Sequence, residues 1–360
     1  MVKNICCFCE VVIEESLLLS SHERKHLALM ILLLLLPRLP ASCVPFVLSY
    51  KLVQCLMDIL ATKNSNLHET AVYFMTELVN WIGNDDDRRV SVIVALQKHS
   101  SGRFDCITKT QTVKELVAKF STGQGCLLFV HNLMSLFVDD GILADEPSDQ
   151  SQTTDENSEI CSVEDKDSPE GSGNTDTLKN WIVETMPRVL KNLKLDSNAN
   201  SLADTEIIKF LEEKFQVQAE IMKFLAVQGL FSASLGTEVT SFELQEKFKW
   251  PKATISRSLC RMCIEQLQLL LEDAQRGEVS NITSSSTERN DLGSYFMCFL
   301  KTLCNIPSVS LYRTLSEKDD EAFKKLQEIE SRLLQEVVRY SSIFLDDLCI
   351  FVVEISKNNI

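Results

Sequence analysis

Glycine and proline are scarce in this sequence. It contains 11 glycines and 8 prolines among 360 residues, whereas these two types make up roughly 12% of an average protein. Because turns of β-hairpins and β-sandwiches depend on them, their scarcity argues against an all-β fold. The hydrophobic content of 45% is that of a globular protein, and no run before residue 139 alternates as a strand does. The sequence therefore predicts an all-α fold.

A surplus of positive charge is also missing. Lys and Arg number 36 against 51 Asp and Glu, which gives a net charge of −15. A protein that binds nucleic acid over its whole surface requires the opposite balance, because the phosphates are negative. Any contact with nucleic acid must therefore be made by a local patch.

Most of the negative charge lies in residues 139–176. This stretch has thirteen acidic residues, one basic residue (Lys166) and many Ser and Thr. It has too few apolar side chains to offset the entropy of folding, so we expect a disordered acidic linker at 139–176. Thr153 and Ser162 each stand just ahead of acidic residues and are candidate sites for acid-directed kinases.

The linker divides the chain into a helical-repeat block at 1–138 and a second helical block at 177–360. Apolar spacing near 3.6 residues predicts helices over 27–36, 46–60, 67–82, 87–98, 177–195, 207–229, 251–276, 296–306 and 321–355, of which 207–229 is either one long helix or a pair. Pro251 suits the first turn of its helix, and Gly277 suits its end. Helices of this length cannot bury their apolar faces alone. We therefore expect a HEAT/ARM-like α-solenoid in two blocks.

The longest apolar run, 27–36, resembles a secretion signal because it follows Arg24 and Lys25 and precedes Cys43, a candidate lipid-attachment residue. However, it begins far from the N-terminus, behind several acidic residues. Its ten residues also fall short of the roughly 20 that span a bilayer. We expect a fully buried helix here, and a secreted, lipid-anchored helical protein remains the alternative.

The thirteen cysteines are odd in number and lie mostly in apolar stretches, which suits a reducing compartment. Cys6, Cys7 and Cys9 form one cluster, and Cys260 and Cys263 form another. Neither cluster has the second pair that a structural zinc site requires. We expect no metal site, and we expect the Cys260 pair to lie on the buried side of its helix.

The acidic run Asp85–Asp87 admits two interpretations. Paired carboxylates can hold two metal ions for phosphoryl transfer, but acidic residues are also favoured where a helix begins. Because a helix is expected to start here, we favour the second interpretation. No phosphate-binding loop, nucleophile elbow or kinase motif is present. The sequence therefore predicts no catalytic residue and no cofactor.

One cluster combines basic and aromatic residues. Arg257 and Arg261 are four apart, which places them on one face of a helix, and the lysines precede that helix, whose N-terminus attracts phosphate. The alternative is an ordinary solvated face. The residues that we expect to contact a nucleic-acid backbone are Lys247, Lys249, Trp250, Lys252, Arg257 and Arg261.

Long stretches of the sequence resemble the Myb-binding protein / DNA polymerase V (polymerase phi) family, and its plant branch in particular. The stretches are LLLSSHERKH at 17–26, VSVIVALQKHS at 90–100, GRFDCITKTQTV at 102–113, SDQSQTTDENSEICSVEDKDS at 148–168 and FELQEKFKWPKATISRSLCRMCIEQLQLLL at 242–271. The resemblance covers nearly everything after about Glu15 and leaves out Met1–Cys9. Separately, the order of residue types from Asp87 to Leu96 is similar to that of HEAT repeats.

The resemblance implies a nucleolar, DNA-associated scaffold that regulates rRNA gene transcription and supports ribosome biogenesis. Its expected partners are ribosomal DNA or chromatin and nuclear transcription or ribosome-assembly proteins, with no membrane and no small-molecule substrate. Family members are longer, which implies a partial chain. The family name also suggests an alternative function, that of a DNA-directed DNA polymerase. The family's members, however, resemble scaffolds rather than enzymes.

Overall fold

The computed structural model describes residues 2–139, 173–193, 204–230, 255–279, 292–304 and 325. Every regular element in this part of the chain is a helix, which confirms the all-α prediction. The elements before the acidic segment are α1 (Val2–Phe8), η1 (Cys9–Leu18), α2 (His22–Leu35), η2 (Leu36–Arg38), η3 (Ala41–Cys43), α3 (Val44–Val47), α4 (Tyr50–Ala61), α5 (His68–Ile82), α6 (Asp86–His99), α7 (Phe104–Thr108), α8 (Thr112–Ala118) and α9 (Gly123–Val138). Those after it are α10 (Gly173–Val189), η4 (Leu190–Asn192), α11 (Asp204–Leu230), α13 (Arg257–Val279) and α14 (Leu292–Cys304).

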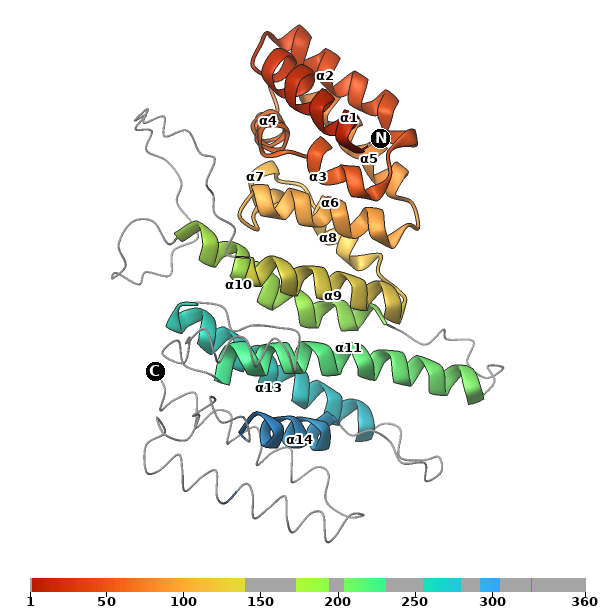
Figure 1. Ribbon diagram of the computed structural model, residues 1–360, viewed down its shortest axis with the longest axis vertical. Helices are drawn as coiled ribbons and strands as arrows, with labels where there is room; N and C mark the ends of the chain where they lie inside the picture. Colours follow the sequence, from red (N-terminus) through yellow and green to blue (C-terminus); the bar gives the residue numbers. More distant parts are fainter. Residues whose placement is uncertain are drawn as a thin grey trace.

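The helices follow one another along the long axis of the molecule, from the N-terminal elements at one end toward α14 at the other (Figure 1). From α6 onward, α6 packs on α9, α9 on α11, and α11 on α14. A second set of helices lies beside this first set, because α8 packs on α6, α10 on α9, and α13 on both α10 and α11. Helices in the middle of the stack, such as α9 and α11, thus bury their apolar faces against neighbours of both sets.

Polar side chains fix where several helices begin. The Oγ of Ser49 accepts from the backbone N–H of Leu52 at 3.5 Å, and the Oγ1 of Thr122 accepts from Gly125 at 3.0 Å. Such N-caps satisfy backbone donors that have no partner within the helix. They set the starts of α4 and α9.

The two helical blocks expected on either side of the acidic segment are in direct contact. Phe137 on α9 meets Phe224 on α11 edge to face, with ring centroids 5.2 Å apart, and both rings are fully buried. The amide of Asn192 donates to the backbone oxygen of Val117 at 2.9 Å. One continuous core therefore spans both blocks. Residues 140–172 of the expected linker lie outside the described residues, and 173–176 begin α10.

Helix boundaries differ from the expected ones in the second block. Residues 204–230 form one long helix, which is one of the two forms expected for 207–229, whereas α13 begins at Arg257 rather than in a turn containing Pro251. The reason is a cap, because the Oγ of Ser256 accepts from the backbone N–H of Leu259 at 3.3 Å. Gly277 does not end α13, which continues to Val279, and α14 begins at Leu292, four residues before its expected start.

The leucine run at 27–36 is only half buried, so the expectation of a fully buried helix was wrong. Leu29 and Leu32 are buried, but Leu27 is 49% exposed and Leu34 is 77% exposed. The cause is position, because α2 packs against η1 and α5 at one end of the stack. Its outer side has no further helix of the described chain against it.

Candidate functional site

The basic cluster that the sequence suggested is described only in part. Lys247, Lys249, Trp250 and Lys252 lie outside the described residues, as do the phosphorylation candidates Thr153 and Ser162. Arg257 is the first residue of α13, and Arg261 follows one turn later, where its exposed guanidinium lies 3.0 Å from the carboxylate of Glu265. An exposed pair of this spacing contributes only about 0.3–0.5 kcal/mol. The cluster's role in nucleic-acid binding therefore stays a prediction.

The acidic run Asp85–Asp87 begins a helix, as expected. The Oδ1 of Asp85 accepts from the backbone N–H of Arg88 at 3.0 Å, and Asp86 and Asp87 lie in the first turn of α6. Asp86 pairs with Arg89, which is buried with 3% of its surface exposed. Two of the three carboxylates are thus engaged in holding the start of α6.

Arg89 links this helix start to its surroundings. Its guanidinium donates to the backbone oxygen of Gly83 at 2.8 Å and lies 5.1 Å from the ring centroid of Phe120. Gly83 has a φ of +51°, a conformation that side-chain-bearing residues rarely adopt. A Cβ at Gly125 in the first turn of α9 would overlap the carboxylate of Asp86. The close fit of the α5–α6 turn against α9 therefore depends on both glycines.

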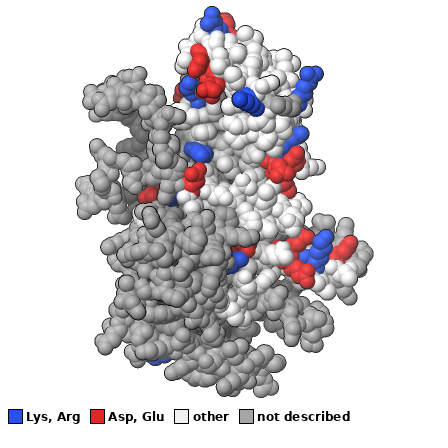
Figure 2. All heavy atoms as spheres, in the orientation of Figure 1, with Lys and Arg blue, Asp and Glu red and all other residues white. Residues whose placement is uncertain are grey.

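Charged side chains elsewhere are mixed in sign. On the face shown in Figure 2, Lys and Arg of the described part lie close to Asp and Glu, and broad uncharged areas separate these groups. No continuous basic surface appears among the described residues on this face. Several of the pairs are within one helix, such as Glu184 with Arg188 and Glu272 with Arg276.

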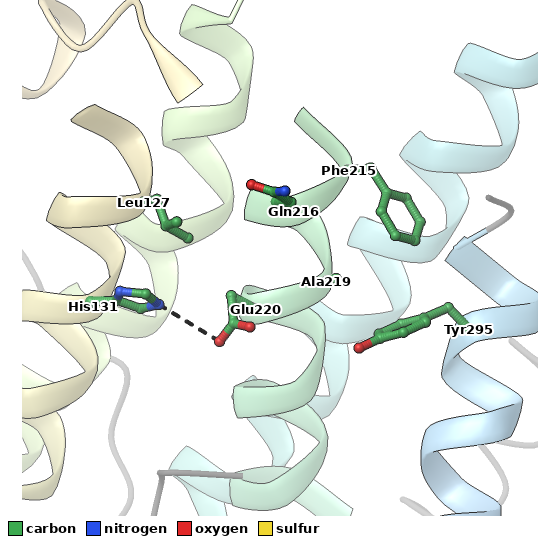
Figure 3. Close-up of a pocket in the computed structure, with 7 residues that line it drawn as sticks. All are labelled: Leu127, His131, Phe215, Gln216, Ala219, Glu220 and Tyr295. Carbon is green, nitrogen blue, oxygen red and sulfur yellow. Dashed lines mark ion pairs between the residues drawn. The ribbon is translucent and has the colours of Figure 1, made fainter. Parts of the chain in front are cut away.

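A cavity of about 230 Å³ lies where α9, α11 and α14 meet. Figure 3 shows the lining side chains converging from these helices. Phe215 and Tyr295 form an aromatic wall, with ring centroids 5.7 Å apart in an edge-to-face arrangement. The lining residues are Leu127, His131, Phe215, Gln216, Ala219, Glu220 and Tyr295.

Glu220 gives this cavity its charge. Its carboxylate lies 3.7 Å from the Nε2 of His131 and pairs with Lys223 on the next turn of α11. Burial raises the pKa of Glu220, but hydrogen bonds and charge from His131 and Lys223 outweigh burial and bring the pKa down to about 2. The carboxylate is therefore ionised at neutral pH and can accept hydrogen bonds, but it cannot donate a proton there.

No pattern in the sequence indicated this cavity. Its polar residues, His131 on α9 and Glu220 on α11, are far apart in the chain and match no spacing motif. Only packing brings them together, because the two helices are neighbours in the stack.

Among the described cysteines, Cys6, Cys7, Cys9, Cys43, Cys55, Cys106 and Cys126 are free thiols. Cys263 is buried, and the Sγ of Cys260 lies 3.4 Å from the backbone oxygen of Gln228, so the pair sits on the packed side of α13 as expected. Burial raises the pKa of Cys126 to about 12. Cys43, the candidate lipid-attachment residue, is fully buried. Within the described ranges, no group of three or more His, Cys, Asp or Glu is arranged to hold a metal ion.

None of the described helices alone is long and apolar enough to cross a bilayer. The segments Ala41–Val47 and Tyr50–Ala61 meet the criterion only when taken together, and they are bent by 70° relative to each other.

Comparison with known proteins gives one family. No curated protein and no solved structure matches the chain significantly. The sequence model of the family described as DNA polymerase phi matches residues 2–340. This match takes in residues 2–9, which the resemblance of the sequence stretches left out. Because it covers nearly the whole chain, the protein belongs to the DNA polymerase phi family.

Proposed function

We propose that the protein is a nucleolar, DNA-associated scaffold that regulates rRNA gene transcription and ribosome biogenesis. Membership of the DNA polymerase phi family over residues 2–340 is the observation that carries this proposal. Its partners are ribosomal DNA or chromatin and nuclear transcription or ribosome-assembly proteins, rather than a small-molecule substrate or a membrane.

The arrangement of the helices supports a scaffold. The set α6, α9, α11 and α14, with α8, α10 and α13 beside it, suits a HEAT/ARM-like α-solenoid. In such proteins each unit contacts only its neighbours, and the stack offers an extended surface for partners. The continuous core between α9 and α11 would hold that surface rigid.

We propose further that the protein is not a polymerase. The most concentrated acidic run in the described residues begins α6, with Asp85 capping the helix and Asp86 paired with the buried Arg89. This use as a helix start leaves Asp87 as the carboxylate least engaged in the fold. Primer extension by the purified chain tests the proposal. We expect no template-dependent synthesis, and synthesis that disappears in Asp87→Asn would overturn it.

Imaging tests the nucleolar part of the proposal. The chain, tagged at its C-terminus, is expressed beside a nucleolar marker, with the tag alone as the control. We expect the tagged chain to coincide with the marker. Signal in the secretory pathway would contradict the proposal and favour the lipid-anchored alternative, in which Cys43 would become the mature N-terminus.

A further inference from the structure

Five exposed cations lie around α7, α8 and η4. Some exposed cations elsewhere, such as Arg188, Arg261 and Arg276, pair with a carboxylate on their own helix. Within the described residues, none of the five forms an ion pair. We call them the α8–η4 basic surface. Its members are Arg103, Lys109, Lys114, Lys119 and Lys191.

Specific contacts bring these residues together. The Oδ1 of Asp105 on α7 accepts from the backbone N–H of Val113, and its Oδ2 accepts from that of Lys114, both at 3.0 Å. These bonds hold α7, which lies between Arg103 and Lys109, against the start of α8. At the other end of α8, the amide of Asn192 donates to the backbone oxygen of Val117 at 2.9 Å.

That last contact joins elements from the two sides of the acidic segment. Lys119 follows Val117 by two residues, and Lys191 directly precedes Asn192. Gly102 also lies against α10, because a Cβ at this position would come within 2.9 Å of the Cβ of Trp181. The neighbouring Arg103 therefore lies near Trp181 on α10.

The local charge is positive. In residues 103–119 the acidic side chains are Asp105 and Glu115. Both oxygens of Asp105 are occupied by backbone donors, and Thr110 adds a third hydrogen bond. Within residues 103–119, Glu115 is thus the one uncommitted carboxylate among four cations. This contrasts with the chain as a whole, whose net charge is −15.

We propose that the α8–η4 basic surface binds the backbone phosphates of duplex DNA. Lys114 in the first turn of α8 and Lys119 just past its end are about 8 Å apart along the helix axis, so they would contact different phosphates of a duplex. Phe104 and Phe120 are buried and Trp181 is half-buried. Single strands are typically held by stacking on exposed rings, so the buried rings favour duplex over single-stranded nucleic acid.

This inference rests on the proposed DNA association and assigns it a place. The contacts would be to the backbone and would carry no base readout. The surface is separate from the cluster around Arg257 and Arg261, which lies at the start of α13. If the α8–η4 basic surface binds DNA, variants of its lysines should lose affinity. If the cluster at the start of α13 binds DNA instead, variants of Arg257 and Arg261 should lose affinity.

The test is the salt dependence of binding to a labelled DNA duplex of random sequence, followed by fluorescence anisotropy with the full chain. The variant Lys114→Gln/Lys119→Gln/Lys191→Gln removes three cations from the surface. The variant Lys51→Gln/Lys209→Gln/Arg276→Gln removes the same charge elsewhere. All six positions are exposed, and thermal unfolding checks that both variants keep the fold.

We expect the surface variant to bind less tightly than the control variant. The slope of log affinity against log salt should fall by about 0.9 for each lost phosphate contact, hence by about 2 to 3 in the surface variant. The control variant should keep nearly the slope of the wild type. An unchanged slope in the surface variant would overturn the assignment while leaving DNA association standing.

Three other results would also overturn it. A slope that falls only in Arg257→Gln/Arg261→Gln would move the contact to α13. Tighter binding of single-stranded RNA, lost in the surface variant, would exclude duplex DNA as the ligand. If the wild-type chain binds no duplex at low salt, then the DNA association in the proposed function fails as well.

Discussion

The contact between Phe137 and Phe224 tests whether the helices on both sides of the acidic segment unfold as one unit. Both rings are fully buried, and they meet edge to face at 5.2 Å. Replacing a buried Phe with Ala costs about 3–5 kcal/mol, a large share of the 5–15 kcal/mol typical of a folded domain. We therefore expect Phe137→Ala and Phe224→Ala each to lower the free energy of unfolding by about 3–5 kcal/mol.

The pair should also be coupled. An aromatic edge-to-face contact adds about 0.5–1.5 kcal/mol beyond burial. The double variant should therefore lose about 0.5–1.5 kcal/mol less than the sum of the two single variants. Leu34→Ala is the control, because this side chain is 77% exposed and surface changes usually stay within about 0.5 kcal/mol.

Urea unfolding measures these effects. Circular dichroism follows the helices, and fluorescence follows tryptophans that include Trp81 on α5 and Trp181 on α10. We expect the two signals to change in one transition and each Phe variant to shift all of it. Two transitions, with only one of them shifted, would refute the reasoning, because the blocks would then unfold independently despite their shared core.

Three further predictions concern buried charges and thiols. Asp86→Asn should lower the free energy of unfolding, measured in urea, by about 3 kcal/mol because it leaves the buried charge of Arg89 unpaired. Adding Arg89→Met should recover part of this loss. A larger loss in the double variant than in Asp86→Asn would contradict the explanation. The pKa of Glu220 is lowered from 4.5 to about 2. The ionised carboxylate therefore contributes its full stabilisation at pH values above the unfolded-state pKa of 4.5, and this contribution is lost as the pH falls through about 2. The stability gap between wild type and Glu220→Gln should thus be smaller at about pH 3 than at neutral pH, and a constant gap would exclude the ion pair as its cause. With its pKa near 12, Cys126 should react with iodoacetamide far more slowly than the exposed Cys106, and equal rates by peptide mass spectrometry would show that Cys126 is accessible.

Long helices with a regular apolar period could be predicted from the sequence. The expected helix at 67–82 is α5 (His68–Ile82), and that at 87–98 lies within α6 (Asp86–His99). The reason is that several turns repeat the same spacing. By contrast, α7 and α8 have five and seven residues, too few to show a period. The α8–η4 basic surface depends on these short helices, which is why no sequence pattern indicated it.

Helix boundaries and side-chain exposure were harder to predict from the sequence. A boundary depends on competition between nearby capping residues, and exposure depends on which helices pack alongside. Pro251 and Ser256 both suit the start of a helix, and the structure uses the cap at Ser256. The leucines of α2 suggested full burial, but burial requires a helix on each side, and Leu34 faces outward. The cavity at Glu220 likewise requires three helices to meet, a fact that spacing along the chain does not contain.

The most direct test of the central proposal is occupancy of ribosomal DNA in cells. The tagged chain is cross-linked to chromatin and recovered, and ribosomal DNA is measured against other repeated sequences and against the tag alone. The proposed function predicts selective recovery of ribosomal DNA. Recovery equal to that of the tag alone, from cells in which the chain is expressed and folded, would contradict it.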